Sequence, residues 1–241
     1  MNALDRLALF LPAILPACRE ARPQVQQGPV LELAFEGTCG PNAVAELGLE
    51  VSPSGISFEG GIEGRAVHLE DAALRLSGLE RLGLADSMTL EFFVNLADWH
   101  NPYGEGTVKN LISHSDLFAV AVKGWALEAR VTTAGAEKAQ RLSGDSFPPD
   151  SWHHVALVLD GEQGCARLVL DGRDIARTSA RGRIAIDPAL ELIVGTWREQ
   201  EETFSGLLDS VRLWSRALTA GELRARAALL DRKNASAAIR G

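Results

Sequence analysis

Two short segments that combine aromatic with polar side chains are the strongest candidates for ligand binding in this sequence. The candidate residues are Trp99, His100, Asn101, Tyr103, Trp197 and Arg198. Sugars present apolar C–H faces that stack on aromatic rings, while polar side chains bind their hydroxyl groups. The two segments therefore predict a glycan-binding surface, with Trp99 and Tyr103 as its stacking platform. The alternative is that the tryptophan rings fold back and anchor their own loops.

Acidic residues offer the other chemistry that acts on sugars, which is cleavage. A retaining glycosidase needs two carboxyl groups about 5 Å apart. Glu199, Glu201 and Glu202 form a cluster, but they lack the alternation of a strand and are typical of a solvated loop. The run 206–211 holds Asp209 and no glutamate beside it. The sequence therefore predicts no catalytic residues and no enzyme.

Asp209 is a candidate for a buried carboxylate. It shares strand parity with Val211 and Leu213, so alternation predicts that its side chain points inward. A buried carboxylate must be hydrogen-bonded, paired with a cation or bound to a metal. A structural calcium ion is one possibility, because calcium prefers oxygen ligands. The other, which we favour, is a hydrogen bond to the backbone or a pair with Arg212 or Arg216. No cofactor is required.

The histidines do not form a metal site by their spacing. His153 and His154 are adjacent in a predicted strand, so their side chains point to opposite faces and cannot chelate one ion together. We expect both to pack and hydrogen-bond within the domain. The order of residues typical of a Ser-His-Asp triad, a phosphate-binding loop and a C-x-x-C pair are all absent from the sequence.

Composition narrows the class of protein. The chain has 241 residues, enough for one large β domain, and 46% of them are hydrophobic. A formal net charge of −8 argues against nucleic acid as a partner, because nucleic-acid binding demands a basic surface. No run approaches the roughly 20 apolar residues of a membrane span, so we expect a protein that does not cross a membrane.

Period-two alternation from Val30 to Trp214 predicts many short strands. The clearest run places Met88, Leu90, Phe92, Val94 and Leu96 on one face. Glycine-containing turn signals separate the runs, and they stand at 60–61, 123–124, 160–161 and 171–172. Strands without intervening helices favour an all-β antiparallel sandwich.

One short helix is predicted near the C-terminus. Thr219 and Glu222 have the spacing of a capping box, and Leu223 follows as the first residue of an apolar stripe. We expect a single domain over 29–232, followed by a frayed tail at 233–241.

The N-terminal residues 1–28 form an apolar segment and a linker. Residues 7–17 have the length of the apolar region of a secretory signal peptide, although Pro12 and Pro16 interrupt them. The alternatives are a segment packed on the domain and a lipidated Cys18. If Cys18 is removed or lipidated, Cys39 and Cys165 could pair in an oxidising compartment or remain buried thiols. We expect export to the periplasm, the cell surface or the exterior.

Residues 204–223, FSGLLDSVRLWSRALTAGEL, carry a family resemblance. They resemble the run F-x-G-x-I-D-E-V-R-I-Y-N-R-A-L-S-x-E-E that ends the laminin-G-like domains of the concanavalin A-like lectin/glucanase superfamily. Residues 151–158 and 168–172 resemble the Trp-His-His-Val-Ala and Asp-Gly hairpin of the same domains. The resemblance covers about residues 30–223 and implies a jelly-roll sandwich, whose closure protects its edges.

The superfamily contains both enzymes that cleave sugars and domains that bind without catalysis. Its laminarinase-type enzymes carry a motif resembling E-x-D-x-x-E on one strand, and this chain lacks it. The resemblance therefore implies a non-catalytic module, for which a glycan is the expected ligand. A protein-binding adhesion or scaffold domain at the cell surface is the alternative, and a glycoside hydrolase is the disfavoured third. The calcium ligands of laminin-G and pentraxin domains have no counterparts that can be aligned here.

Overall fold

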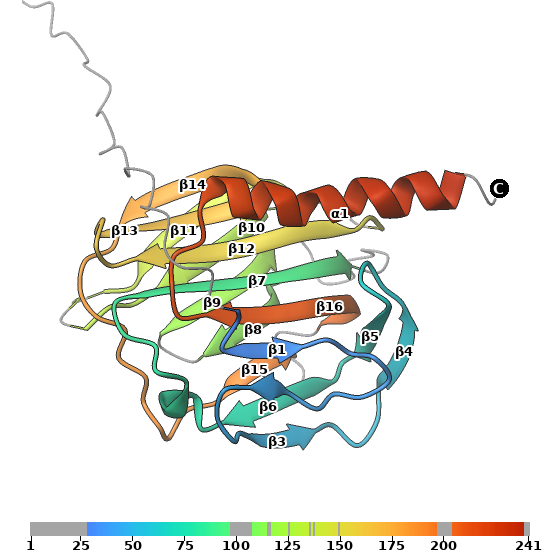
Figure 1. Cartoon of the computed structure of the whole chain (residues 1–241), viewed down its shortest axis with the longest axis horizontal. Coiled ribbons are helices and arrows are strands. Elements are labelled where there is room, and N and C mark those ends of the chain that lie inside the picture. The colour runs from blue at the N-terminus through green and yellow to red at the C-terminus, as the bar shows by residue number, and fades with distance from the viewer. Residues whose placement is uncertain are drawn as a thin grey trace, which may run out of the picture.

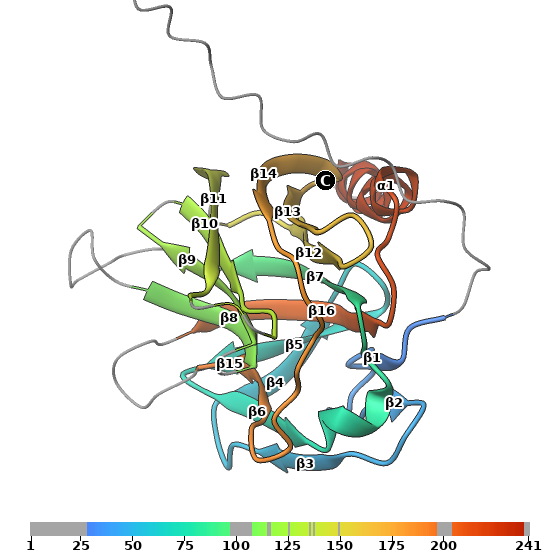
Figure 2. The ribbon, with the colours of Figure 1, turned by 90° about the vertical axis from the view of Figure 1, so that its left-hand side faces the viewer.

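The computed structural model describes residues 28–96, 108–114, 117–124, 126–134, 136, 138–148, 150–196 and 204–238. Two antiparallel sheets pack face to face and one helix lies outside them, which confirms the predicted sandwich (Figures 1 and 2). Sheet A contains β14 (Arg173–Ser179), β13 (Cys165–Leu170), β12 (His153–Asp160), β7 (Ser87–Leu96), β16 (Ser205–Trp214), β1 (Leu31–Leu33), β2 (Asn42–Ala43), β5 (Arg65–Glu70) and β4 (Ile56–Gly60). Sheet B contains β11 (Gln140–Ser146), β10 (Ala126–Val131), β9 (Phe118–Lys123), β8 (Val108–His114), β15 (Leu192–Gly195), β6 (Ala73–Ser77) and β3 (Gly48–Val51).

The hydrophobic core fills the space between the two sheets. Leu90, Phe92 and Val94 of β7 point into it and are fully buried, as their alternation predicts. Glu91 and Phe93 point to the opposite face of sheet A, yet each is only 1% exposed. Sheet A is therefore covered on both sides, whereas the sequence pattern indicates cover on one.

A β-bulge in β16 changes the direction of one predicted side chain. The register with β7 shifts between Asp209 and Arg212, and Ser210 has a φ of 52°. The extra residue reverses the alternation, so Leu208 and Val211 face the core while Asp209 lies outside it. Asp209 is fully buried, as expected, but the prediction that it points into the core is wrong.

Helix α1 (Ala220–Ala238) lies along the outer face of sheet A (Figure 1). The capping box is confirmed, because Glu222 accepts a bond from the Thr219 backbone N–H at 2.8 Å and donates its own N–H to Thr219 Oγ1 at 3.2 Å. Leu223 and Leu218 pack in a second apolar cluster between the helix and β12 and β13. The helix reaches Ala238. Residues 233–238 of the segment expected to be a frayed tail, 233–241, are therefore helical.

A short 3-10 helix, η1 (Leu79–Leu82), links β6 to β7 and completes the described secondary structure. Among the described residues, no helix has both the length and the apolar character needed to span a membrane.

The states of Cys39 and Cys165 match neither of the two alternatives that the sequence left open, a disulfide between them or two buried thiols. Cys39 is a free thiol, whereas Cys165 is disulfide-bonded, so these two cysteines are not joined to each other. The third cysteine of the chain, Cys18, lies outside the described residues. Burial raises the pKa of the Cys39 thiol.

The strand ends that flank the predicted binding segments lie close together. Leu96, the last residue of β7, pairs with Gly206 at the start of β16. The backbone N–H of Phe204, just before β16, donates to Thr196 Oγ1, just after β15, at 3.0 Å. The described residues Leu96, Thr196 and Phe204, which flank segments 97–107 and 197–203, therefore lie at one end of the sandwich, which we call the loop end.

Candidate functional site

A groove of about 290 Å³ opens on the outer face of sheet B. Phe118, Val120 and Val122 of β9 point into the core, so the residues between them point outward. Two of these are Ala119 and Ala121, whose small side chains leave a depression along the strand. The groove therefore exists because β9 carries alanine where its neighbours carry long side chains.

Strand register brings polar side chains together across this groove. Ala121 pairs with Asn110 of β8 on one side and with Glu128 of β10 on the other, and Glu128 pairs in turn with Ser143 of β11. These four residues form a row across four strands. The side chain of Asn110 is 2% exposed and donates to the carbonyl oxygen of Gly195 at 2.8 Å, which holds β8 against β15.

Three cations line the groove beside this polar row. Ala119 pairs with Arg130, which pairs with Arg141, and Lys123 pairs with Val108 at the other end of β9. Lys123 and Arg141 are both exposed. In the described part of the chain, neither forms an ion pair or a side-chain hydrogen bond. Val108 directly follows the predicted binding segment 97–107, so the groove runs to the loop end.

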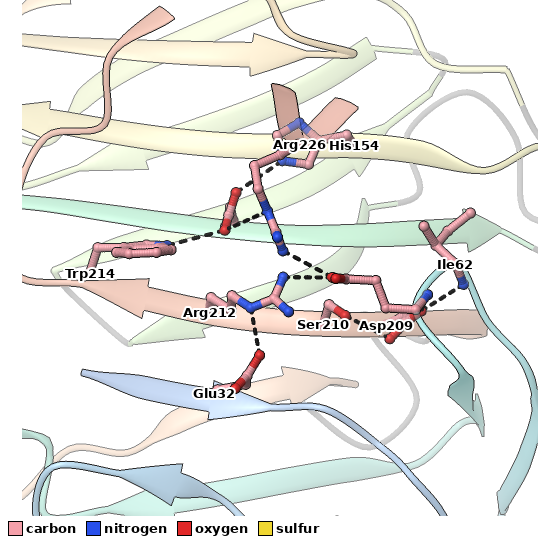
Figure 3. A network of polar contacts seen from close by, with 10 residues as sticks. Glu32, Ile62, His154, Asp209, Ser210, Arg212, Trp214 and Arg226 are labelled. Carbon is pink, nitrogen blue, oxygen red and sulfur yellow. Dashed lines mark hydrogen bonds and ion pairs between the residues drawn. The ribbon is translucent and has the colours of Figure 1, made fainter. Parts of the chain in front are cut away.

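The outer face of sheet A differs, because its charged residues belong to a connected set of buried and half-buried side chains (Figure 3). We call this set the polar layer, and its members are Glu32, Glu63, Glu91, His154, Asp209, Arg212, Trp214 and Arg226. They come from β1, the β4–β5 turn, β7, β12, β16 and helix α1.

Glu91 lies at the centre of the polar layer. Its carboxylate accepts hydrogen bonds from Trp214 Nε1 and from His154 Nε2, both at 3.2 Å. Arg226 Nε of α1 lies 3.3 Å from the same carboxylate. A buried carboxylate is costly without partners, and these three groups compensate for the loss of water.

Glu63 joins the helix to the sheet. Its Oε2 atom lies 2.8 Å from Arg212 Nη1 of β16 and 3.0 Å from Arg226 Nη2 of α1. Arg212 also donates from Nε to Glu32 Oε1 at 2.6 Å. Burial lowers the pKa of Arg212, but the charges of Glu63 and Glu32 outweigh it and raise the pKa overall.

The β4–β5 turn encloses Asp209. Oδ2 of Asp209 accepts the backbone N–H groups of Ile62 and Glu63 at 2.7 and 2.8 Å, and Oδ1 accepts the Ser210 hydroxyl at 3.0 Å. Burial raises the pKa of Asp209 to about 6, against the opposing effect of these donors. The backbone hydrogen bonds are the alternative that we favoured from sequence, although among the described residues Asp209 forms no ion pair with Arg212 or Arg216.

The same turn holds the far half of the helix. Lys233 Nζ donates to the carbonyl oxygens of Gly60, at 3.0 Å, and of Gly61. It also lies 4.9 Å from the centre of the Trp152 ring, within reach of a cation–π interaction. Burial lowers the pKa of Lys233, and the nearby charge of Asp209 partly offsets that effect. The turn thus binds β16 through its N–H groups and α1 through its carbonyl groups.

The two predicted structural histidines point to opposite faces, as expected. His154 lies in the polar layer, while His153 faces the core side and is 8% exposed. His153 Nδ1 lies 2.9 Å from Asp171 Oδ2, and His153 Nε2 lies 2.9 Å from Ser151 Oγ. Folding therefore forms a Ser-His-Asp chain from residues whose sequence order did not predict one.

The contacts around the hydrogen-bonded residues Ser151, His153 and Asp171 indicate a structural role for them. The second oxygen of Asp171 accepts the backbone N–H of His154 at 2.9 Å, and the ring of Phe147 lies 4.7 Å from the imidazole. Burial opposes ionisation of Asp171, but the hydrogen bonds from both histidines outweigh it and lower its pKa. These contacts fix the start of β12 to the β13–β14 turn.

The predicted site residues have different outcomes. Trp99, His100, Asn101, Tyr103, Trp197 and Arg198 lie outside the described residues. Asp209 is described, and no group of three or more potential metal ligands occurs among the described residues. The groove was missed, because its signal, alanine at two outward positions of one strand, acquires meaning only with the strand register.

The model of one family, the concanavalin A-like lectin/glucanases superfamily, matches residues 69–224. The sequence is similar to that of adhesion G-protein coupled receptor V1 of Danio rerio. The two are 31% identical over 96 residues, which are 38% of this chain and 2% of the receptor.

Solved binding domains of toxins share the fold. The binding domain of Paraclostridial Mosquitocidal Protein 1 superposes with a TM-score of 0.70 at 15% identity, over 83% of this chain and 52% of that one. The binding domain of Botulinum Neurotoxin DC in complex with SialylT gives 0.69 at 10% identity, over 84% and 51%. The chain thus spans about half the length of these domains.

Proposed function

The chain belongs to the concanavalin A-like lectin/glucanases superfamily, and on this premise we propose that it is a non-catalytic module that binds a glycan. The proposed site is the groove of sheet B together with segments 97–107 and 197–203 at the loop end. The single observation that carries the proposal is an open groove whose lining includes Lys123 and Arg141, two cations that form no ion pair with the residues that the structure describes. Such a lining is typical of ligand sites, which combine apolar surface with a few polar groups.

The groove suits a sugar ring by its chemistry. Ala119 and Ala121 offer a flat apolar floor, and Glu128 and Ser143 stand beside it as partners for hydroxyl groups. We propose that Trp99 and Tyr103 add a stacking platform where the groove meets the loop end, with His100, Asn101, Trp197 and Arg198 as further contacts. Replacing Trp99 with alanine should then weaken glycan binding several-fold, because a stacking ring contributes about 1 kcal/mol.

A protein ligand is the second candidate. The identity with a segment of an adhesion receptor favours it, since that receptor is named for adhesion. The two candidates differ in one simple respect. Binding to a protein at the loop end would survive an excess of free sugar, whereas glycan binding would not.

Catalysis is disfavoured because the carboxylates of Glu63 and Glu91 are both paired with arginine. Arg226 contacts the carboxylates of both Glu63 and Glu91, of which Glu91 is buried and Glu63 is half-buried. The Ser151–His153–Asp171 chain gives a direct check. A fluorophosphonate probe, which reacts with activated serines, should leave Ser151 unlabelled; labelling that is lost in Ser151→Ala would contradict a non-catalytic module.

We also propose that the protein is exported. Disulfides persist in oxidising compartments, and the disulfide-bonded state of Cys165 supports this location. A structural calcium ion at Asp209 is the further proposal, and it predicts that a chelator lowers the melting temperature.

A glycan array probed with the full chain, with and without chelator, tests the proposed function. We expect binding to a related group of glycans, with no release of shorter sugars over long incubation. Absence of binding to every glycan, combined with capture of a surface protein that free sugars do not displace, would replace the proposal with the adhesion alternative.

A further inference from the structure

The cations of the sheet B groove are unusual for this protein. Lys123, Arg130 and Arg141 line it, and Glu128 is the one acidic residue among its lining. The chain as a whole has a net charge of −8. A basic depression on an acidic protein attracts anions while the rest of the surface repels them.

The pairing of these cations is equally informative. Arg212 and Arg226 on the covered face each contact two carboxylates. In contrast, Lys123 and Arg141 form no ion pair within the described part of the chain. Arg141 pairs directly with Arg130 on the neighbouring strand, and holding two like charges side by side costs electrostatic energy, which an anionic ligand would offset.

We propose, resting on the proposed function, that the groove binds an acidic oligosaccharide whose carboxylate or sulfate groups contact Lys123 and Arg141. The spacing of these two residues sets the size of the ligand. Lys123 lies four residues from Ala119 along β9, which corresponds to about 13 Å. Arg141 lies two strands beyond Ala119, which adds about 10 Å across the sheet. Two cations so far apart fit charges on separate sugar units.

Glu128 refines the class of ligand. It lies in the row between the two cations, paired with Ala121 and Ser143. A carboxylate at this position repels a third anionic group and accepts hydrogen bonds from hydroxyl groups. The groove therefore favours a saccharide in which acidic units alternate with uncharged ones over a uniformly charged polymer.

Three oligosaccharides of similar length distinguish the possible ligands: one with alternating uronic acid units, one sulfated, and one neutral. Binding of the full chain to each is measured by calorimetry at two salt concentrations. We expect the acidic sugars to bind at least about ten-fold more tightly than the neutral one and to lose affinity as salt rises. Tighter binding of the uronic acid oligosaccharide would identify carboxylate as the recognised group, and tighter binding of the sulfated one would identify sulfate.

A matched pair of variants locates the effect. Lys123→Gln with Arg141→Gln should remove the preference for acidic sugars and its salt dependence. Arg81→Gln with Arg224→Gln makes the same change in net charge at exposed positions outside the groove and should leave both intact. Equal loss in both double variants would overturn the proposal, since net charge alone would then explain the preference.

The outcomes also separate this inference from the proposed function. Binding of the neutral sugar as tightly as the acidic ones would reject an acidic ligand while leaving a glycan-binding module in place. Failure of all three sugars, together with an array on which no glycan binds, would reject the proposed function itself.

Discussion

The outer faces of the two sheets use charged residues in opposite ways. On sheet A the polar layer is buried or half-buried beside α1 and the β4–β5 turn, and Glu91, Arg212 and Arg226 each have two or more partners. On sheet B, Lys123 and Arg141 stand in an open groove without ion pairs in the described part of the chain. Charges that partner one another hold a fold together, whereas unpaired charges in a groove are available to a ligand.

This comparison predicts that changes on the covered face affect stability and changes in the groove affect binding. The largest effect is expected for Arg226→Met. The variant leaves Glu91 buried with two partners and detaches Glu63 from α1, so the free energy of unfolding should fall by about 3 kcal/mol. Chemical denaturation measures the change.

Arg224→Met is the matched control, because Arg224 lies on the exposed side of the same helix. Its loss should stay within about 0.5 kcal/mol. If both variants unfold at the same denaturant concentration as the wild type, the ion pairs of Arg226 do not contribute to stability. The proposed difference between the two sheet faces would then lack support on sheet A.

The β4–β5 turn allows a smaller and sharper test. A Cβ atom on Gly61 would lie 2.4 Å from Asp209 Oδ2 and 2.8 Å from the backbone carbon of Arg65. Gly61→Ala should therefore lower the free energy of unfolding by about 2 kcal/mol. Gly60→Ala, where a Cβ meets nothing within 4 Å, should change it by less than about 0.5 kcal/mol. An equal effect at the two glycines would show that the turn does not enclose Asp209.

Asp209 should also give the covered face a pH dependence. Its pKa is raised from 3.8 to about 6 in the folded state, so the protonated form is favoured by folding. The stability that this group contributes is complete below pH 3.8 and is lost as the pH rises through about 6, to a total of at most about 3 kcal/mol.

Asp209→Asn, which cannot ionise, should remove this slope from unfolding curves recorded between pH 4.5 and 7.5. Asp171 and Glu222 have lowered pKa values, so the stability they contribute is lost as the pH falls through those values, below this window. A slope that is unchanged in Asp209→Asn would mean that another group titrates.

Much of the fold could be predicted from local patterns. Alternation in 88–96 gave the correct inward face of β7, and Thr219 and Glu222 gave the correct start of α1. The errors come from features that depend on distant partners. The bulge at Ser210 reversed the direction of Asp209, and nothing near that residue in the sequence indicates the turn that encloses it.

The candidate site was less predictable than the fold. The aromatic segments stand out by composition alone, whereas the groove results from four strands whose register brings Asn110, Ala121 and Glu128 into one row. Two outward-facing alanines signal a depression only when the longer neighbours on the adjacent strands are known. Strand pairing is non-local, and period-two patterns do not specify it.

The most direct test of the comparison is a steric block that leaves every charge in place. Ala121→Trp fills the groove floor, and Ala228→Trp adds the same bulk to the exposed side of α1. Both proteins are read on the same glycan array as the wild type, after denaturation confirms that each is folded. We expect Ala121→Trp to lose the glycans bound by the wild type and Ala228→Trp to keep them. Retention of the full glycan profile by Ala121→Trp would contradict a binding site in the groove.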